Sequence, residues 1–273
     1  MQSLAPLFLL FLLLINASAQ DEAQVRAKID LIAWGNKIPG LTLKNPSGET
    51  SAAFSFEYNK SLTYVGPQIL AIYQLETKEE QPPIEDDDDY NDGYEEEPAP
   101  PQPAEDLVDI KNIKDPLIKS LFERKIKEPN LVSLVKLPTN SRHLTILLAP
   151  ASGGTFLPYV IDDDPSKLPF GKLRVHNLTN IPILLEQLNG PQRCELRANE
   201  KFLLNADDAN KFTYKLSYKK GDRWKAQQNN ILRIPANSQN QFIVLQSNNQ
   251  YFRSSDGSKG GFLQVVLLKR KAS

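Results

Sequence analysis

Short runs in which apolar and polar residues alternate follow one another along most of the chain. Clear examples are "LTYVG" at 62–66, "QILAIYQL" at 68–75, "KFTYKLSYK" at 211–219 and "GFLQVVLLK" at 261–269. The runs are rich in β-branched and aromatic residues and are separated by Gly, Pro, Asn and Asp, which is typical of strands joined by turns. Their number and spacing predict a mostly β protein built of two tandem immunoglobulin-like β-sandwich units.

One segment, "DPLIKSLFERKIKE" at 115–128, has a helical pattern instead. Asp115 can cap a helix and Pro116 suits its first position. The apolar residues recur at helical spacing and would form one face; they are Leu117, Ile118, Leu121, Phe122 and Ile126. The pattern predicts one short helix in the first unit.

Two stretches resemble each other, "LPTNSRHLTILL" at 137–148 and "IPANSQNQFIVL" at 234–245. The identical positions, at an offset of 97, are Pro138 and Pro235, Asn140 and Asn237, Ser141 and Ser238, Ile146 and Ile243, and Leu148 and Leu245. The unit starts correspond at an offset of 144, which pairs Lys28 with Lys172. We therefore expect an internal repeat, with unit 1 at 20–164, a linker at 165–171 and unit 2 at 172–271.

The first unit exceeds the second by about the length of an acidic, proline-rich segment plus the helix. Residues 76–109 contain 15 of the chain's 33 acidic residues and one of its 32 basic residues. The remainder therefore carries an excess of 13 positive charges. With few aliphatic residues, the segment cannot bury enough apolar surface to offset the entropy of ordering, so we expect a disordered insertion at 76–114. It could mask the basic remainder of its own molecule.

Calcium binding is an alternative for the run "DDDDYNDG" at 86–93, because hard cations prefer clustered carboxylates. With Asp88 placed first on the EF-hand template, Tyr90 falls at the third position and Ala99 at the twelfth, so two ligands are missing. A solvated segment is the interpretation we favour. A calcium-dependent adhesion module remains open.

A second acidic run, Asp162, Asp163 and Asp164, lies between two strand-like runs and is followed by Pro165 and Pro169. Such a run is typical of a turn at a domain boundary. The alternative is an acidic catalytic loop, in which these carboxylates would serve a hydrolase acting on envelope polysaccharide. We favour the joint, because adjacent Asp side chains do not converge in an extended segment.

The first 19 residues read as a signal peptide, with an apolar run from Leu4 to Ile15 followed by the small-x-small pattern Ala17-Ser18-Ala19. The run is too short to span a bilayer, so no membrane span is expected after cleavage. The protein is therefore expected to be exported, to the periplasm, the cell surface or the medium. Cys194 is the only cysteine, which excludes an internal disulfide, and we interpret it as a small half-buried residue.

No recognised catalytic or metal-binding motif is found. His143 and His176 are the only histidines, and each lies in a strand-like run without the spacing of a metal site or a catalytic triad. We interpret both as structural. The sequence thus predicts a protein that is not an enzyme, with no cofactor and no catalytic or metal-binding residue.

The segment 211–225, "KFTYKLSYKKGDRWK", carries the most distinctive candidate surface. Strand alternation places its aromatic residues on one face and a row of lysines on the other, ending at a turn. The candidate residues for binding an anionic polymer are Lys211, Lys215, Lys219, Lys220, Arg223, Trp224 and Lys225. The explanation that we favour is edge-strand protection, since lysines discourage pairing between exposed strands.

The stretch "FGKLRVHNLTNIPILLEQLNG" at 170–190 resembles small extracytoplasmic β-sandwich modules of uncharacterised bacterial exported proteins. The residues that carry the resemblance are Gly171, Arg174, Val175, Asn177, Asn189 and Gly190. It implies export and a sandwich fold and supplies no activity. We therefore expect a non-enzymatic binding or structural protein of the cell envelope, whose unknown partner is an envelope protein or an anionic polymer.

Overall fold

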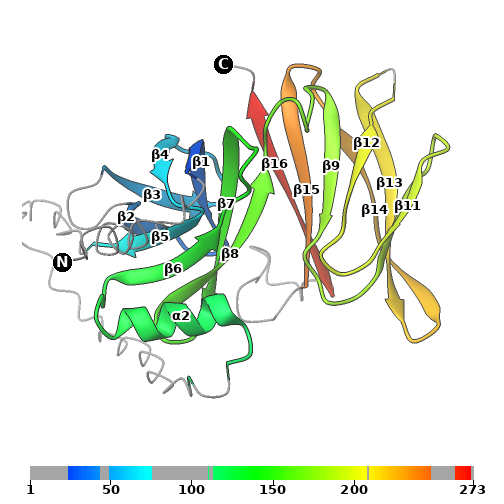
Figure 1. The fold of residues 1–273 in the computed structure, drawn as a ribbon. Helices are drawn as coiled ribbons and strands as arrows, with labels where there is room; N and C mark the ends of the chain where they lie inside the picture. The colour runs from blue at the N-terminus through cyan, green and yellow to red at the C-terminus, as the bar shows by residue number, and fades with distance from the viewer. Residues whose placement is uncertain are drawn as a thin grey trace, which may run out of the picture.

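The computed structural model describes residues 24–43, 49–75, 110, 113–207, 209–246 and 262–271. In these residues the chain forms sixteen strands and one helix, so the mostly β class is confirmed (Figure 1). The predicted signal peptide and the acidic segment at 76–109 lie outside the described residues, as does the calcium-binding alternative at 86–93.

The first unit is one curved sheet of eight strands in the order β6-β5-β2-β3-β1-β7-β8. β4 pairs with the start of β1, on the same edge as β3 and opposite β7. Its strands are β1 (Val25–Ala33), β2 (Ile38–Thr42), β3 (Thr50–Ser55), β4 (Leu62–Gly66), β5 (Ile69–Gln74), β6 (Leu131–Lys136), β7 (His143–Ala151) and β8 (Thr155–Asp162). The two ends of this order meet, because Ser133 Oγ on β6 donates to the carbonyl of Phe156 on β8 at 2.9 Å. The sheet is therefore nearly a barrel, where two separate sheets were expected.

The second unit consists of two sheets of four strands, in the orders β11-β10-β13-β14 and β12-β9-β15-β16. Its strands are β9 (Lys172–Asn177), β10 (Ile183–Gln187), β11 (Arg193–Leu196), β12 (Lys201–Asn205), β13 (Lys211–Lys220), β14 (Arg223–Arg233), β15 (Ser238–Gln246) and β16 (Leu263–Lys271). Both sheets contribute to one buried core, in which Tyr214 of β13 meets Phe242 of β15 edge to face at 5.1 Å. The unit is a β-sandwich.

The same pairing pattern occurs in both units. The first, fourth, seventh and eighth strands form the order β4-β1-β7-β8 in one and β12-β9-β15-β16 in the other. The remaining strands form β3-β2-β5-β6 and β11-β10-β13-β14. The difference is a short parallel pairing of β1 with β3, where Ile32 is opposite Phe54; it joins the two halves of the first unit into one sheet.

One hydrogen bond in each unit occupies the same place in the shared pairing pattern. Trp34 N donates to Leu148 O, and Leu178 N donates to Val244 O, both at 2.9 Å. These pairs give offsets of 144 and 96. The first offset equals the one that pairs Lys28 with Lys172, and the second differs by one residue from the predicted 97.

A slip of one residue turns each side chain to the opposite face of a strand. Ile146 accordingly lies in the first unit's core, whereas its predicted counterpart Ile243 lies in a different cluster, between the units. The sequence could not reveal the slip, because all residues of β15 from Ser238 to Leu245 are buried. A strand buried on both faces has no alternation by which to fix its register.

The predicted helix is present as α2 (Pro116–Lys125). The Asp115 side chain caps it, accepting hydrogen bonds from Leu117 N at 2.8 Å and Ile118 N at 3.1 Å. Leu121 is buried in a small cluster with Leu131 and Leu134 of β6, so the helix covers the outside of the first unit (Figure 1).

The two units pack face to face through equivalent strands. Ile32, Leu147 and Ile161 of β1, β7 and β8 meet Ile243 and Leu245 of β15 and Leu268 of β16, and all six are buried. The sheet β12-β9-β15-β16 therefore has the sandwich core on one face and the first unit on the other. The connection contains Gly171, whose φ of 75° and close approach to the Ala236 backbone disfavour any side chain.

Candidate functional site

The three aspartates at the joint differ in burial: Asp163 is buried, whereas Asp162 and Asp164 are half-buried, and Asp164 begins a turn. Asp162 accepts hydrogen bonds from Ser141 Oγ and from Lys167 Nζ, the latter at 2.6 Å. Asp163 is 1% exposed, and Asp164 accepts from Ser166 N at 3.0 Å and Ser166 Oγ at 2.7 Å. The run thus lies between the two units, as expected of a joint, but each carboxylate has a fixed partner.

Asp163 belongs to a buried ionic cluster that links the two units, which we define as Asp30, Asp163, Arg270, Thr145 and Gln241. Arg270 on β16 donates to Asp30 on β1, and its Nη2 lies 3.2 Å from Asp163 Oδ2. Thr145 Oγ1 and Gln241 Nε2 also donate to Asp163. One guanidinium therefore serves two carboxylates, and both units supply members of the cluster.

The pKa values of the two carboxylates in the cluster are shifted in opposite directions. Burial raises the pKa of Asp163, against the lowering effect of Arg270. Burial also acts on Asp30, but its hydrogen bond to His143 and the charge of Arg270 outweigh that effect and lower its pKa. Arg270 in addition stacks on the Tyr58 ring, 4.5 Å from its centroid.

The order of contacts around Asp30 does not fit a catalytic triad. Ser61 Oγ donates to Asp30 Oδ1 at 2.6 Å, and His143 Nε2 lies 3.1 Å from Asp30 Oδ2. In a triad the histidine lies between the serine and the carboxylate and removes the serine proton. Here the carboxylate lies in the middle, so this arrangement holds side chains in place and activates no nucleophile.

The other histidine and the cysteine also have structural surroundings. His176 is buried and lies 2.7 Å from Gln241 Oε1, and burial lowers its pKa to about 4. Cys194 is buried in the sandwich core, where burial raises the pKa of its thiol to about 11. At neutral pH the imidazole is thus neutral and the thiol protonated, which suits core residues.

A polar cleft of about 620 Å³ opens beside the joint. Gln24 and Arg26 line it from the start of β1, Asp164 and Ser166 from the connection, and residues 139–142 from the loop before β7. None of the eight lining residues is aromatic or aliphatic. Sequence reasoning missed this site, because its residues come from three separate segments.

The hydrolase alternative needs two carboxylates that face one cavity. The cleft has one, Asp164, since Asp163 is buried in the ionic cluster and Asp162 is not among the lining residues. Within the described ranges, no group of three or more His, Cys, Asp or Glu side chains could hold a metal ion. Asp162 and Asp163 thus hold the joint together, and Asp164 is the one carboxylate that lines the cleft.

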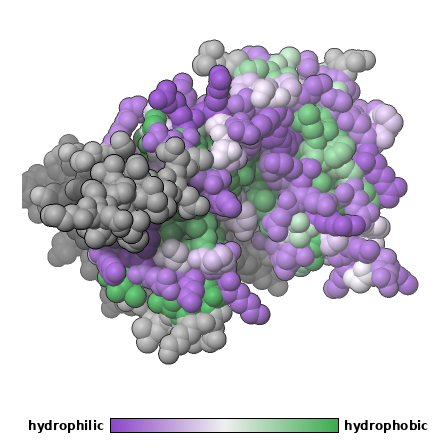
Figure 2. Space-filling model, in the orientation of Figure 1, coloured by the Kyte–Doolittle hydropathy of each residue, from purple (hydrophilic) through white to green (hydrophobic). Residues whose placement is uncertain are grey.

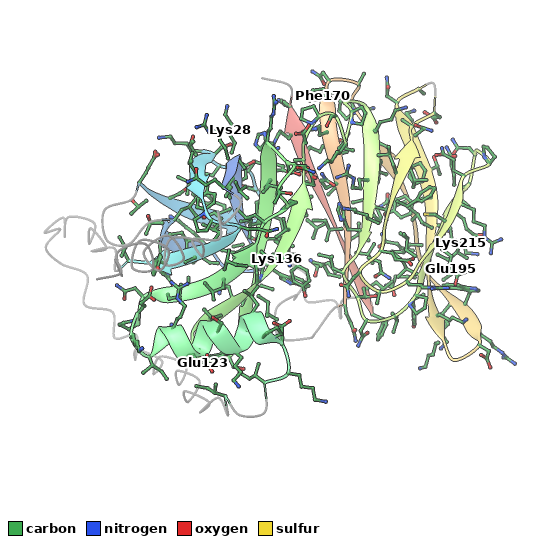
Figure 3. The ribbon with its side chains drawn as sticks, in the orientation of Figure 1. Lys28, Glu123, Lys136, Phe170, Glu195 and Lys215 are labelled. Carbon is green, nitrogen blue, oxygen red and sulfur yellow. The ribbon has the colours of Figure 1, made fainter. Side chains whose placement is uncertain are left out.

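The predicted anion-binding residues do not form one surface but lie at the tip, in the middle and at the far end of the β13–β14 hairpin. Lys220 and Arg223 are directly opposite each other at the tip of the β13–β14 hairpin, and Lys219 is opposite Trp224. Lys211 is at the far end of β13, opposite Arg233. Lys215 lies between them on the outer face, opposite Glu186 of β10, in the region where Figure 3 labels Lys215 and Glu195.

We define the basic hairpin tip as Lys219, Lys220, Arg223, Trp224 and Lys225. Lys220, Arg223 and Lys225 are exposed, whereas Lys219 and Trp224 are half-buried. Among the described residues, none of the four basic side chains has an ion pair. The tip thus carries four basic side chains without an ion pair and one carboxylate, that of Asp222 in the turn. Figure 2 shows hydrophilic residues over much of the visible face of this unit.

Edge protection does not explain the lysines of β13. β13 is paired on both sides, with β10 and β14, so it is not an edge strand. The edge is β14, whose middle consists of Gln227, Gln228, Asn229 and Asn230. Edge protection, the explanation that we favoured, required β13 to lie at the edge of the sheet, and this was wrong. The edge strand is the polar β14, most of which the sequence pattern did not predict.

Several residues that carry the resemblance to exported β-sandwich modules have structural roles. Arg174 donates to the carbonyls of Asp162 and Lys167 and so attaches β9 to the connection. Asn177 is fully buried and donates to the carbonyls of Ile181, Leu196 and Arg197. These contacts position turns of the second unit.

Comparison with protein-family models finds no match, and comparison with curated proteins finds no relative. In the part of the chain that the structure describes, no helix is long and apolar enough to cross a membrane. The function must therefore be argued from the joint, the cleft and the hairpin tip.

Proposed function

We propose that this chain is an exported, non-enzymatic binding protein of the cell envelope, in which the basic hairpin tip contacts an anionic polymer. The observation that carries the proposal is the concentration of four basic side chains without an ion pair and one tryptophan at the end of the paired β13–β14 hairpin. Positive surfaces of this kind attract polyanions, and the exposed Arg223 with the half-buried Trp224 beside it can add stacking contacts.

The architecture supports a binding role in a second way. The two units are joined through a buried apolar cluster and a buried ionic cluster, so the hairpin is carried on a stiff body. We also propose that residues 1–19 are a signal peptide and that the two units are tandem, mutually related units of immunoglobulin-like type. The shared strand-pairing pattern and the offsets of 144 and 96 support that relationship.

The test measures binding of the full chain without its first 19 residues to an immobilised polyuronate and to polyglutamate. We expect the double variant Lys220→Gln/Arg223→Gln to weaken binding several-fold at low salt, with a shallower salt dependence, because two fewer counterions are displaced. The matched control is Lys119→Gln/Lys127→Gln, which removes two exposed charges around α2. Equal weakening by both variants would mean that binding depends only on net charge. That result would contradict the proposed role of the tip.

A further inference from the structure

Two arginines line the polar cleft, and their guanidinium groups have no ion pair among the described residues. Arg26 on β1 and Arg142 just before β7 both line the cleft and are both exposed. They lie on neighbouring strands, since Lys28 N donates to Arg142 O at 2.9 Å. Among the described residues neither side chain has an ion pair. Two free arginines at one cavity form a ready receptor for a negative group.

The wall of the cleft is held in place before any ligand arrives. Lys167 Nζ donates to Asn140 O at 3.2 Å and to Ser141 Oγ at 2.9 Å. Asp164 Oδ2 accepts from Arg142 N at 3.2 Å. The loop at 139–142 is thus fastened to the joint by both side-chain and backbone bonds. A preorganised wall lowers the entropy lost on binding.

The lining indicates what kind of ligand fits. Besides the two arginines and Asp164, it presents hydroxyl groups from Thr139 and Ser166 and amide groups from Gln24 and Asn140. Such a surface binds a solute that carries many hydrogen-bonding groups, and it offers no apolar contact to a hydrophobic molecule. The volume of about 620 Å³ is within the range of small-molecule sites and accommodates one or two sugar units.

We propose that this cleft binds an acidic sugar, with the sugar carboxylate held between Arg26 and Arg142. The planar guanidinium groups suit a carboxylate through paired N–H···O bonds. The hydroxyls and amides of the lining exchange hydrogen bonds with the ring hydroxyls, and Asp164 accepts from one of them. This site is in the first unit and is separate from the basic hairpin tip, so it does not depend on the function proposed above.

Isothermal titration of the full chain without its first 19 residues, with glucuronate, glucose and inorganic phosphate, tests this proposal. We expect glucuronate to bind more tightly than glucose or phosphate. Arg26→Gln and Arg142→Gln should each weaken glucuronate binding about tenfold or more, since each removes a charge-assisted contact. Lys28→Gln is the matched control, because this exposed neighbour of Arg26 does not line the cleft.

Each contrary outcome has a defined meaning. Phosphate binding as tight as glucuronate binding would show an anion site without sugar recognition and would overturn the proposal. So would the absence of glucuronate binding at millimolar concentration in protein whose thermal transition is intact. Lys220→Gln/Arg223→Gln should leave glucuronate affinity unchanged, which keeps this test independent of the hairpin tip.

Discussion

The ionic cluster at the joint and the basic hairpin tip are both rich in charge, but their charges are arranged in opposite ways. In the cluster, Arg270 lies between the buried carboxylates of Asp30 and Asp163 and is itself 15% exposed. At the tip, the basic side chains are mostly exposed and have no acidic partner among the described residues. A buried, paired charge is costly to disturb, whereas an exposed and unpaired charge is free to meet a partner.

The largest expected effect is at the centre of the cluster. Arg270→Met leaves Asp30 and Asp163 buried without their shared cation, and breaking a buried pair in this way costs about 3–5 kcal/mol of the free energy of unfolding. Chemical denaturation measures this loss. The control is Lys269→Met, which changes an exposed neighbour and should cost less than about 0.5 kcal/mol. Similar losses in both variants would mean that the cluster contributes no more to the free energy of unfolding than exposed charges do.

The pH dependence of stability tests the buried imidazole beside the cluster. The pKa of His176 is about 4 in the folded chain, below its ordinary 6.5, because of burial and, secondarily, the charges of Arg174 and Lys201. The unfolded chain therefore takes up the proton first, so this contribution to stability is present above pH 6.5 and is lost as the pH falls toward 4. The loss is about 3 kcal/mol.

Comparison of the wild type with His176→Gln isolates the contribution of this group. Melting temperatures recorded from pH 7 to pH 4 should fall less steeply in the variant, since glutamine does not titrate. Parallel curves for the two proteins would show that His176 is not the group responsible.

A smaller effect is expected where the joint meets the cleft. Lys167 is 41% exposed and donates to Asp162, Ser141 and Asn140. Lys167→Met removes these bonds and should cost about 1 kcal/mol of stability. Because the loop at 139–142 loses its fastening, glucuronate binding should also weaken. Unchanged binding, measured by the same titration, would mean that the loop keeps its position without Lys167.

The smallest effect on stability is expected at the hairpin tip. Lys220→Gln/Arg223→Gln should change the free energy of unfolding by no more than about 0.5 kcal/mol, because surface substitutions without partners rarely do more. Its effect should appear in polyanion binding instead. Thermal denaturation of the same samples provides the check, and a large loss of stability would show that the tip has a structural role.

Local patterns allowed much of the fold to be predicted from the sequence. The run at 62–66 coincides with β4, and Asp115 caps α2 as expected, because both depend on neighbouring residues. β11, β12 and most of β14 were missed. β14 is polar through its middle, from Gln227 to Asn230, so it lacks the alternation that identifies a strand.

The aspartate run lies between β8 and β9, but its chemistry was not foreseeable. Asp30 and Arg270 are 240 residues apart, and no local pattern relates two such positions. The run of three aspartates looks the same whether its side chains are solvated or buried. Whether Asp163 is buried depends on which strands pack over it, and that is decided by the tertiary structure.

The distance along the chain between Asp30 and Arg270 also constrains how the protein can be made. Strands β1 and β7 are synthesised early, yet the arginine that compensates Asp30 is on β16, the last described strand. A chain that ends before β16 leaves both carboxylates uncompensated and the apolar face of β15 without Leu268. The contacts between the two units are therefore complete only after β16 has been synthesised and has paired with β15.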